Sequence, residues 1–552
     1  MKWVSTVRMR HGLGWLGVVV VMAMLRPAVP AAQSPISNAA KAGDTAAVRR
    51  LIAGRADVNV PSSDGSTALL WAVYNSDAAM VKSLLAAGAK PNVANRYGVT
   101  PLLQASRTGD MPIIEALLAA GADVKQPLQD ETPLMAAAKA GRVDAIRLLL
   151  AKGSDVNGVD GNQQQTALMW AAAEGNTEAV SALLEAGAKP NMQAKLAEIT
   201  DRRHADHPTG GFTALMWAAR GGHADTIRTL VKAGADLNVK NGDNASATMI
   251  AIANDRLDIA NLLLDLGADP NDGALYMAVD QHDGTTDMLA RDASLKRWDH
   301  PNQTTTMDLI KRLLAMGADP NKAFQGQLHS ISMCCGDNHN ASAFYRAAVA
   351  SDVEALKVLL PKSDLKWMPT PAPGGRGGAV QRSALMAASV GGRGASFGGG
   401  PGFGRIGPPV WRETGSRKPA DAVELLIKAG ADPNFQLEDD GNTALHQAVQ
   451  RNDKDMIQVL AKNGANLELY NWAGQTPIAI AEEAWDVEKK RVGPPPEVLQ
   501  AMNAGTPIPE VKSARDTIVL MRQMLGWPAW TDEQFGKTAN DTAATPAPAQ
   551  GR

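Results

Sequence analysis

Apolar residues recur along this chain in short clusters, and a threonine or serine opens each cluster. The seven residues TALMWAA stand at 166–172 and again, letter for letter, at 213–219, and a close variant, TALLWAV, stands at 67–73. A polar residue in front of an apolar run is typical of a helix N-terminus, because its side-chain oxygen accepts a hydrogen bond from an unpaired backbone N–H of the first turn. The pattern therefore predicts a short capped helix at each copy.

The opening residues follow one another at intervals of 33, 32, 34, 47 and 33 residues. They are Thr67, Thr100, Thr132, Thr166, Thr213 and Ser246. A second landmark, a Gly-Ala-Asp-x-Asn-like segment, closes each unit and keeps the same period. It stands at 88–92, 121–125, 153–157, 187–191, 234–238, 267–271, 317–321 and 430–434. Two landmarks with one period indicate an array of similar units and not one large core.

Within each unit the residues predict a helix, a turn and a second helix. Pro101, Pro133 and Pro477 directly follow a capping threonine, where the missing N–H of proline costs nothing. Glycines such as Gly109 and Gly141 are expected to turn the chain into a second helix that carries paired leucines. The glycine of the closing landmark is expected to end that helix in the left-handed conformation.

A 33-residue unit with this order of Thr, Pro, Leu and Ala resembles the ankyrin repeat, and the resemblance extends from about Ser37 to Trp527. It implies an all-α ankyrin-repeat α-solenoid of about twelve helix–turn–helix units, with short β-turn fingers and long irregular insertions. The motif's histidine is kept only at His446 and is Leu70 or Met135 elsewhere. Because that histidine normally bonds to the next repeat, we expect these units to rely more on apolar packing.

The N-terminus has the order of regions that is typical of a secretory signal peptide. Basic residues come first, an apolar run spans 12–25, and small residues follow at 29–33. We expect cleavage after Ala31 or Ala32 and a periplasmic or secreted protein, with an uncleaved N-terminal membrane anchor as the alternative. The chain therefore looks like an exported bacterial ankyrin repeat protein.

The expected organisation has five parts. They are a signal peptide at 1–32, N-terminal ankyrin repeats at 33–272, repeats with long Gly/Pro-rich and Cys/His-containing insertions at 273–441, C-terminal repeats and cap at 442–530, and a disordered tail at 531–552.

Four insertions interrupt the repeats, at 193–211, at 282–306, at 325–340, and at 369–381 together with 391–419. The first and third contain metal-ligating residue types. These weak metal candidates are His204, His207, Cys334, Cys335 and His339. Their spacing matches neither a zinc ribbon nor a haem motif, so charged loops and two small buried thiols stay open as alternatives. The Gly/Pro/Arg-rich fourth insertion is predicted to be a flexible loop.

Composition and the absence of catalytic motifs limit the classes of function that we expect. With 55 basic and 57 acidic residues and a net charge of −2, the chain has no overall basic field to hold a phosphate backbone. It lacks the His-Glu-x-x-His, Gly-x-Ser-x-Gly and phosphate-loop motifs, and its carboxylates fall at turn or solvent-facing positions. We expect no enzymatic activity, no cofactor and no nucleic-acid partner. The alternative is a metal- or thiol-dependent redox protein that uses Cys334 and Cys335.

The fourth and seventh residues after each capping residue are predicted to share one stripe of the first helix, on the concave side of an ankyrin-like stack. Tryptophans recur at the fourth position, where most of their area is expected to be packed and one edge left for a partner. The predicted partner-binding residues are Trp71, Tyr74, Tyr97, Arg107, Lys139, Trp170, Trp217 and Arg220. The resemblance implies a protein–protein scaffold that uses the concave face and the finger turns. We expect a monomer without stable membrane insertion after signal cleavage.

Overall fold

The computed structural model describes residues 34–125, 131–198, 208–282, 302–324, 340–369, 382–390, 418–491, 494–504, 512–536 and 538. Residues 34–105 with 110–123 form one compact unit, and residues 106–109 with those from 124 onward form a second. The domain boundaries predicted at 272/273 and 441/442 stay a prediction.

Twelve helix pairs stand in the described ranges, as the period predicts. They are α1 (Pro35–Lys41) with α2 (Thr45–Ala53), α3 (Ala68–Tyr74) with α4 (Ala78–Ala86), α5 (Pro101–Thr108) with α6 (Met111–Ala119), α7 (Pro133–Lys139) with α8 (Val143–Ala151), α9 (Ala167–Ala173) with α10 (Thr177–Glu185), α11 (Ala214–Gly221) with α12 (Ala224–Lys232), α13 (Ala247–Ala253) with α14 (Leu257–Asp265), α15 (Ala274–His282) with α16 (Thr306–Ala315), α17 (Ala343–Val349) with α18 (Val353–Leu359), α19 (Ala384–Val390) with α20 (Pro419–Lys428), α21 (Ala444–Gln450) with α22 (Lys454–Lys462), and α23 (Pro477–Glu488) with α25 (Ala514–Met524). A 3-10 turn, η1 (Leu360–Lys362), extends α18.

The capping residues act as the sequence predicts. Thr67 Oγ1 accepts a hydrogen bond from the backbone N–H of Leu70 at 3.3 Å, and Thr166 and Thr213 cap their helices in the same way. Each cap contributes about 1 kcal/mol to helix stability. Capping matters here because helices of seven to nine residues are too short to be stable alone.

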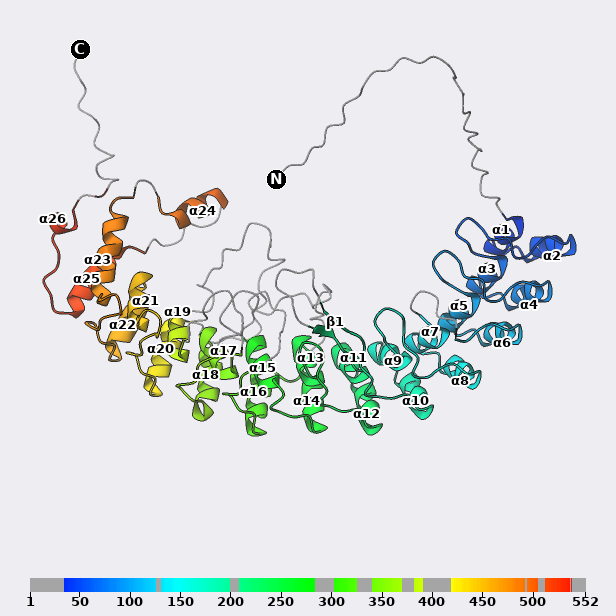
Figure 1. Cartoon of the computed structure of the whole chain (residues 1–552), viewed down its shortest axis with the longest axis horizontal. Helices are drawn as coiled ribbons and strands as arrows, with labels where there is room; N and C mark the ends of the chain where they lie inside the picture. Colours follow the sequence, from blue (N-terminus) through cyan, green and yellow to red (C-terminus); the bar gives the residue numbers. More distant parts are fainter. Residues whose placement is uncertain are drawn as a thin grey trace, which may run out of the picture. The chain divides into compact units, whose positions relative to one another are not determined.

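Successive pairs stack in two layers. In the second compact unit the first helices α9, α11, α13, α15 and α17 lie in one row, and their partners α10, α12, α14, α16 and α18 lie in another (Figure 1). The first leucine of each predicted pair fills the space between the layers, since Leu84, Leu117 and Leu183 are fully buried. Burying one such side chain contributes about 1.5–3 kcal/mol.

Hydrogen bonds between repeats follow the asparagine of the closing landmark. Asn157 Nδ2 donates to the carbonyl of Gly187 at 3.2 Å, and Asn157 Oδ1 accepts from the N–H of Lys189 at 2.9 Å. The same pair of bonds recurs at Asn59, Asn92, Asn191, Asn271 and Asn434. Although most repeats lack the motif's histidine, these asparagine bonds join neighbouring repeats at the finger side, which the sequence reasoning did not predict. We call this series of bonds the asparagine ladder.

The insertions lie where the period breaks. Residues 283–301 separate α15 from α16 and residues 391–417 separate α19 from α20, so both interrupt a helix pair, as predicted. The insertion at 193–211 contains two short strands, which the sequence did not predict. Within it, β1 (Leu196–Glu198) pairs antiparallel with β2 (Pro208–Gly210), with Leu196 opposite Gly210.

The C-terminal end differs from the sequence prediction, which placed a disordered tail from residue 531. Helix α26 (Asp532–Phe535) packs against the last pair, and Phe535 is 2% exposed. Trp485 Nε1 donates to the carbonyl of Phe535 at 3.0 Å. A further helix, α24 (Pro496–Ala504), lies between α23 and α25 in the sequence. Residues 531–536 therefore belong to the cap.

Candidate functional site

The predicted tryptophan column lies in the middle of the first helices α3, α9 and α11. Trp71, Trp170 and Trp217 each stand four residues after a capping threonine and are each half-buried. This agrees with the expected division of each ring between a packed part and an accessible part. Large rings at such positions bury most of their area against neighbouring repeats while one edge stays near the surface.

A cation lies over each indole, but in two of three cases it comes from the preceding repeat. Lys41 Nζ stands 4.7 Å from the centre of the Trp71 ring, and Lys139 Nζ stands 4.4 Å from that of Trp170. Over Trp217 the cation is Arg220 of the same helix, with its Cζ 5.4 Å from the ring centre. Position seven of one repeat therefore pairs with position four of the next.

The indole N–H groups differ in their partners. Trp71 Nε1 donates to Ser62 Oγ at 3.3 Å, and Ser62 in turn donates to Asp64. Burial would raise the pKa of Asp64, but hydrogen bonds from Ser62 and Ser66 outweigh it and hold the pKa below its ordinary value. The buried Nε1 groups of Trp170 and Trp217 have no acceptor among the described residues. Each unpaired donor costs about 1–3 kcal/mol until an acceptor reaches it.

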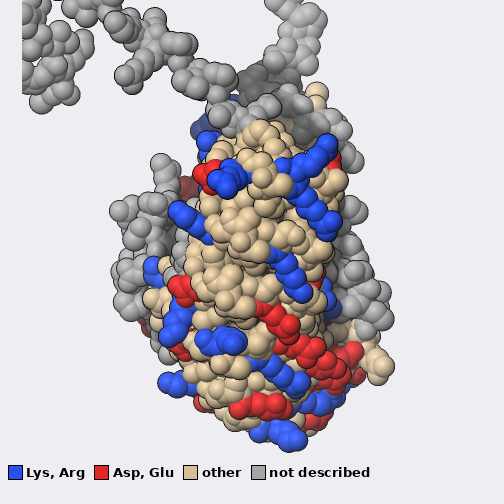
Figure 2. Space-filling model, turned by 90° about the vertical axis from the view of Figure 1, so that its right-hand side faces the viewer, with Lys and Arg blue, Asp and Glu red and all other residues tan. Residues whose placement is uncertain are grey.

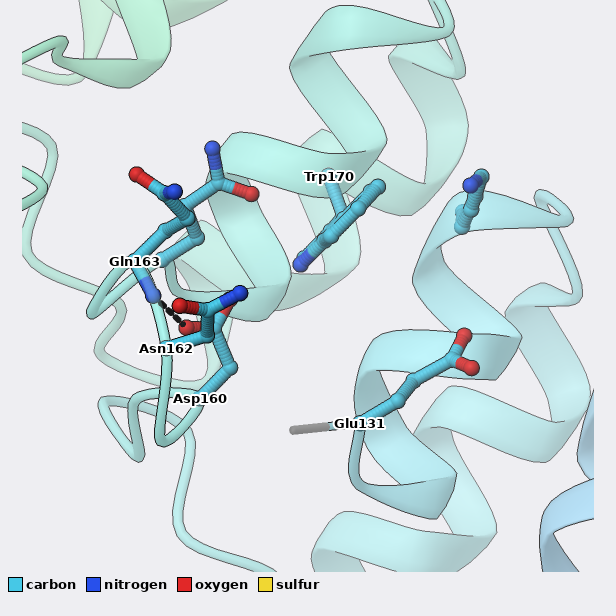
Figure 3. Close-up of a pocket in the computed structure, with 7 residues that line it drawn as sticks. Glu131, Asp160, Asn162, Gln163 and Trp170 are labelled. Atoms are coloured by element: carbon cyan, nitrogen blue, oxygen red, sulfur yellow. Dashed lines mark hydrogen bonds between the residues drawn. The ribbon is translucent and has the colours of Figure 1, made fainter. Parts of the chain in front are cut away.

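A hollow of about 410 Å³ lies beside Trp170. Its lining residues are Glu131, Lys139, Asp160, Asn162, Gln163, Gln165 and Trp170. Figure 3 shows Trp170 and Glu131 facing, across this hollow, the turn that carries Asp160, Asn162 and Gln163. The sequence reasoning missed these amides, although the stretch Asn-Gln-Gln-Gln at 162–165 is visible in the sequence.

Three hydrogen bonds hold the amide-bearing turn in place. The carboxylate of Asp160, 4% exposed, accepts from the N–H of Gln163 at 2.7 Å, and the Asp160 N–H donates to the carbonyl of Gln165 at 3.0 Å. The carbonyl of Gln163 accepts from the N–H of Lys195 in the next finger at 2.7 Å. The amide side chains are therefore presented on a fixed loop.

Three further predicted residues are not among those that line this hollow. Tyr74 packs against Trp71, with ring centres 5.6 Å apart, and Tyr97 projects from a finger turn with 72% of its side chain exposed. Arg107 forms an ion pair with Glu131, so its guanidinium is already engaged.

One pair of residues shows the same cross-repeat geometry in a buried setting. Asp280 stands at position seven of its repeat and Arg346 at position four of the next, and Arg346 Nε donates to Asp280 Oδ1 at 2.6 Å. Their exposures are 8% and 4%. The buried carboxylate also raises the pKa of Tyr276, after burial itself, which is the larger cause.

The metal candidates His204, His207, Cys334, Cys335 and His339 lie outside the described residues. Within the described ranges no three His, Cys, Asp or Glu side chains gather as metal ligands. In the same ranges no helix has the length and apolar character needed to cross a membrane. On the face in Figure 2, Lys and Arg are interspersed with Asp and Glu, and that face shows no continuous basic field.

Comparison with known proteins agrees with this architecture. The family described as "Ankyrin repeats (3 copies)" matches residues 36–127, 104–194, 196–274 and 415–487. The chain belongs to the ankyrin repeat family. Ankyrin repeats are generally protein–protein interaction scaffolds and are typically non-enzymatic.

The similar proteins named next match only part of this chain. The E3 ubiquitin-protein ligase KEG of Arabidopsis thaliana is 30% identical over 156 residues, 25% of this chain and 10% of that protein. The human 2-5A-dependent ribonuclease is 40% identical over 68 residues, 12% of this chain and 9% of that protein. The crystal structure of the human ASB11 ankyrin repeat domain is 26% identical, with a TM-score of 0.37 over 43% of this chain and 99% of that one. The chain thus spans about a tenth of the first two relatives.

Proposed function

We propose that this chain is a non-enzymatic scaffold that binds a protein partner along the stripe formed by positions four and seven of its first helices and on its finger turns. The observation that carries the proposal is the Lys139–Trp170 pair beside a fixed turn of amide side chains. Tryptophan is one of the residue types that dominate binding energy in protein interfaces, and amides supply adaptable hydrogen bonds.

The size of the hollow fits one or two side chains of a protein partner. It is open to solvent, and Lys139 on its rim is exposed. A partner's acceptor group that reached Trp170 Nε1 would pair a donor that has no acceptor among the described residues, which makes that contact more favourable than an ordinary surface hydrogen bond. The exposed Tyr97 adds an aromatic contact on a finger turn elsewhere along the chain.

The proposal places the protein outside a bacterial cytoplasm, as a monomer, after removal of residues 1–32. The basic, apolar and small-residue order at the N-terminus supports this location. Mass spectrometry of the protein from its native cell tests it. A mature N-terminus at Ala32 or Gln33 agrees with export, and an intact Met1 in a cytoplasmic fraction would refute it.

The scaffold function is tested by photo-crosslinking in the native cell. A benzophenone side chain replaces Lys139 in one variant, Arg220 in a second and Lys152 in a control; Lys152 is exposed at the end of the second helix α8. We expect one dominant protein adduct from the first two variants and none from the control. Equal labelling from all three sites, or none from the first two, would contradict the proposal.

A further inference from the structure

The fingers before α21 and α23 present a second surface, distinct from the hollow beside Trp170. Tyr470 and Trp472 project from residues 464–475 with 63% and 61% of their side chains exposed. Among the described residues, Tyr97 is the only other aromatic side chain that is more than half exposed. Exposed aromatic side chains two residues apart are unusual on a surface that contacts only water, and they are the residue types that anchor protein interfaces.

The charge around these rings has one sign. Residues 432–442 and 464–475 contain five carboxylates and no lysine or arginine. The carboxylates are Asp432, Glu438, Asp439, Asp440 and Glu468. Glu438, Asp439 and Glu468 are exposed, and none of the three forms an ion pair within the described part of the chain. This local balance differs from the near-neutral chain as a whole.

The two fingers form one fixed plate. The Trp472 N–H donates to the carbonyl of Asp440 at 2.9 Å, and Trp472 Nε1 donates to the carbonyl of Glu438 at 3.3 Å. Gln436 Nε2 donates to the carbonyl of Tyr470 at 2.8 Å. The indole lies against Gly441, where an added Cβ atom would stand 2.8 Å from its Cγ. A surface fixed in this way loses little freedom when it binds.

We propose that this plate, defined by Glu438, Asp439, Tyr470 and Trp472, docks an arginine- or lysine-rich segment of a protein partner. A guanidinium or ammonium group stacks on the exposed face of an aromatic ring and is attracted by nearby carboxylates. The same carboxylates repel phosphate groups, which disfavours nucleic acid and anionic lipid. The inference rests on the proposed function, since it names the chemistry of a partner segment.

A matched position elsewhere in the chain supplies the sharpest variant. Arg96 occupies the slot of Trp472 in an earlier finger: its N–H donates to the carbonyl of Asp64, and its side chain lies over Gly65. The fold therefore accepts arginine in this slot. Trp472→Arg removes the ring and adds a positive charge without a change in the backbone contacts.

The test uses fluorescence anisotropy with the purified full-length protein and two labelled peptides, an Arg-Gly repeat and a Glu-Gly repeat. We expect the wild-type protein to bind only the Arg-Gly peptide. Trp472→Arg and Glu438→Lys should each weaken binding by about tenfold or more. Glu178→Lys makes the same charge change at an exposed site on α10 and should alter the affinity by less than about twofold.

Three results would overturn the proposal. They are no binding of the Arg-Gly peptide, unchanged binding to Trp472→Arg and Glu438→Lys, and an equal loss with Glu178→Lys, which would reduce the effect to overall charge. Sedimentation of the protein alone adds a fourth. A dimer that Trp472→Arg dissociates would make a second copy of this chain the occupant.

The outcome is separable from that of the scaffold proposal. If the peptide fails to bind while the Lys139 variant still captures a protein, the inference about this plate falls and the scaffold function stands. If the peptide binds as expected and no protein is captured from Lys139, the scaffold proposal falls and the inference about this plate stands.

Discussion

The contact between Gly175 and His223 predicts a specific pattern of stabilities. Gly175 follows α9 with φ of +72°, and a Cβ atom there would stand 2.7 Å from both Cγ and Cε1 of the His223 ring, with Nδ1 closer still. His223 belongs to the next repeat, and its Nε2 donates to the carbonyl of Ala173 at 3.1 Å. Gly175→Ala must therefore displace the imidazole.

The expected cost has two parts. Left-handed backbone at a residue with a Cβ costs about 1–2 kcal/mol, and loss of the His223 hydrogen bond costs about 0.5–1.5 kcal/mol. Gly175→Ala should thus destabilise its repeat by about 1.5–3.5 kcal/mol. The control Gly187→Ala, at φ of +92° with no atom within 4 Å of the added Cβ, should show the backbone cost alone.

A double-mutant cycle isolates the contact. His223→Ala should cost about 0.5–1.5 kcal/mol in the wild-type protein and almost nothing in the Gly175→Ala background, because the ring is already displaced there. Repeat arrays do not unfold in a two-state manner, so the free energies should come from native-state hydrogen exchange of peptides in α9 to α12. An equal cost of His223→Ala in both backgrounds would refute the reasoning.

Three further predictions concern stability. Burial lowers the pKa of His446 below 6.5. Between the folded pKa and 6.5 the unfolded chain therefore binds more protons than the folded one, so hydrogen-exchange protection of α21 should fall as pH falls through that window. His446→Leu, which introduces the residue found at the matching position 70, should abolish this pH dependence. Asn191→Ala removes bonds to Gly234 and Asp236, and native-state hydrogen exchange should show a loss of about 1–3 kcal/mol in the two repeats that these bonds join, with unchanged protection in repeats several units away. Phe535→Ala empties a buried site and should cost about 3–5 kcal/mol; unchanged protection of α23 and α25 would show that α26 does not belong to the cap.

The sequence predicts most of the fold because its signals are local. A threonine caps the helix that directly follows it, and a glycine permits the turn at its own position, so Thr166 and Gly187 can be interpreted without knowledge of their neighbours. Asn157 and its equivalents are also visible in the closing landmark, but the groups to which they bond lie in the next repeat. Only the stacking of repeats reveals them.

The candidate site was predicted less well for the same reason. Lys139 and Trp170 both appear in the predicted set, but the sequence reasoning paired positions four and seven of one helix, whereas the cation over Trp170 comes from position seven of the preceding repeat. Asp280 and Arg346 occupy the same two positions and are buried, while Lys139 is exposed. Exposure at these positions depends on how the surrounding side chains pack, and the period of the sequence does not reveal that packing.

The most direct test of the scaffold account is the affinity of the protein captured from position 139. Its Kd should be measured by calorimetry for the wild-type chain, Trp170→Ala, Lys139→Ala and Lys152→Ala. The account predicts that Trp170→Ala weakens binding by about tenfold or more and Lys139→Ala by a smaller factor, with Lys152→Ala unchanged. Equal affinity of all four proteins would contradict the claim that positions four and seven of the first helices form the binding surface.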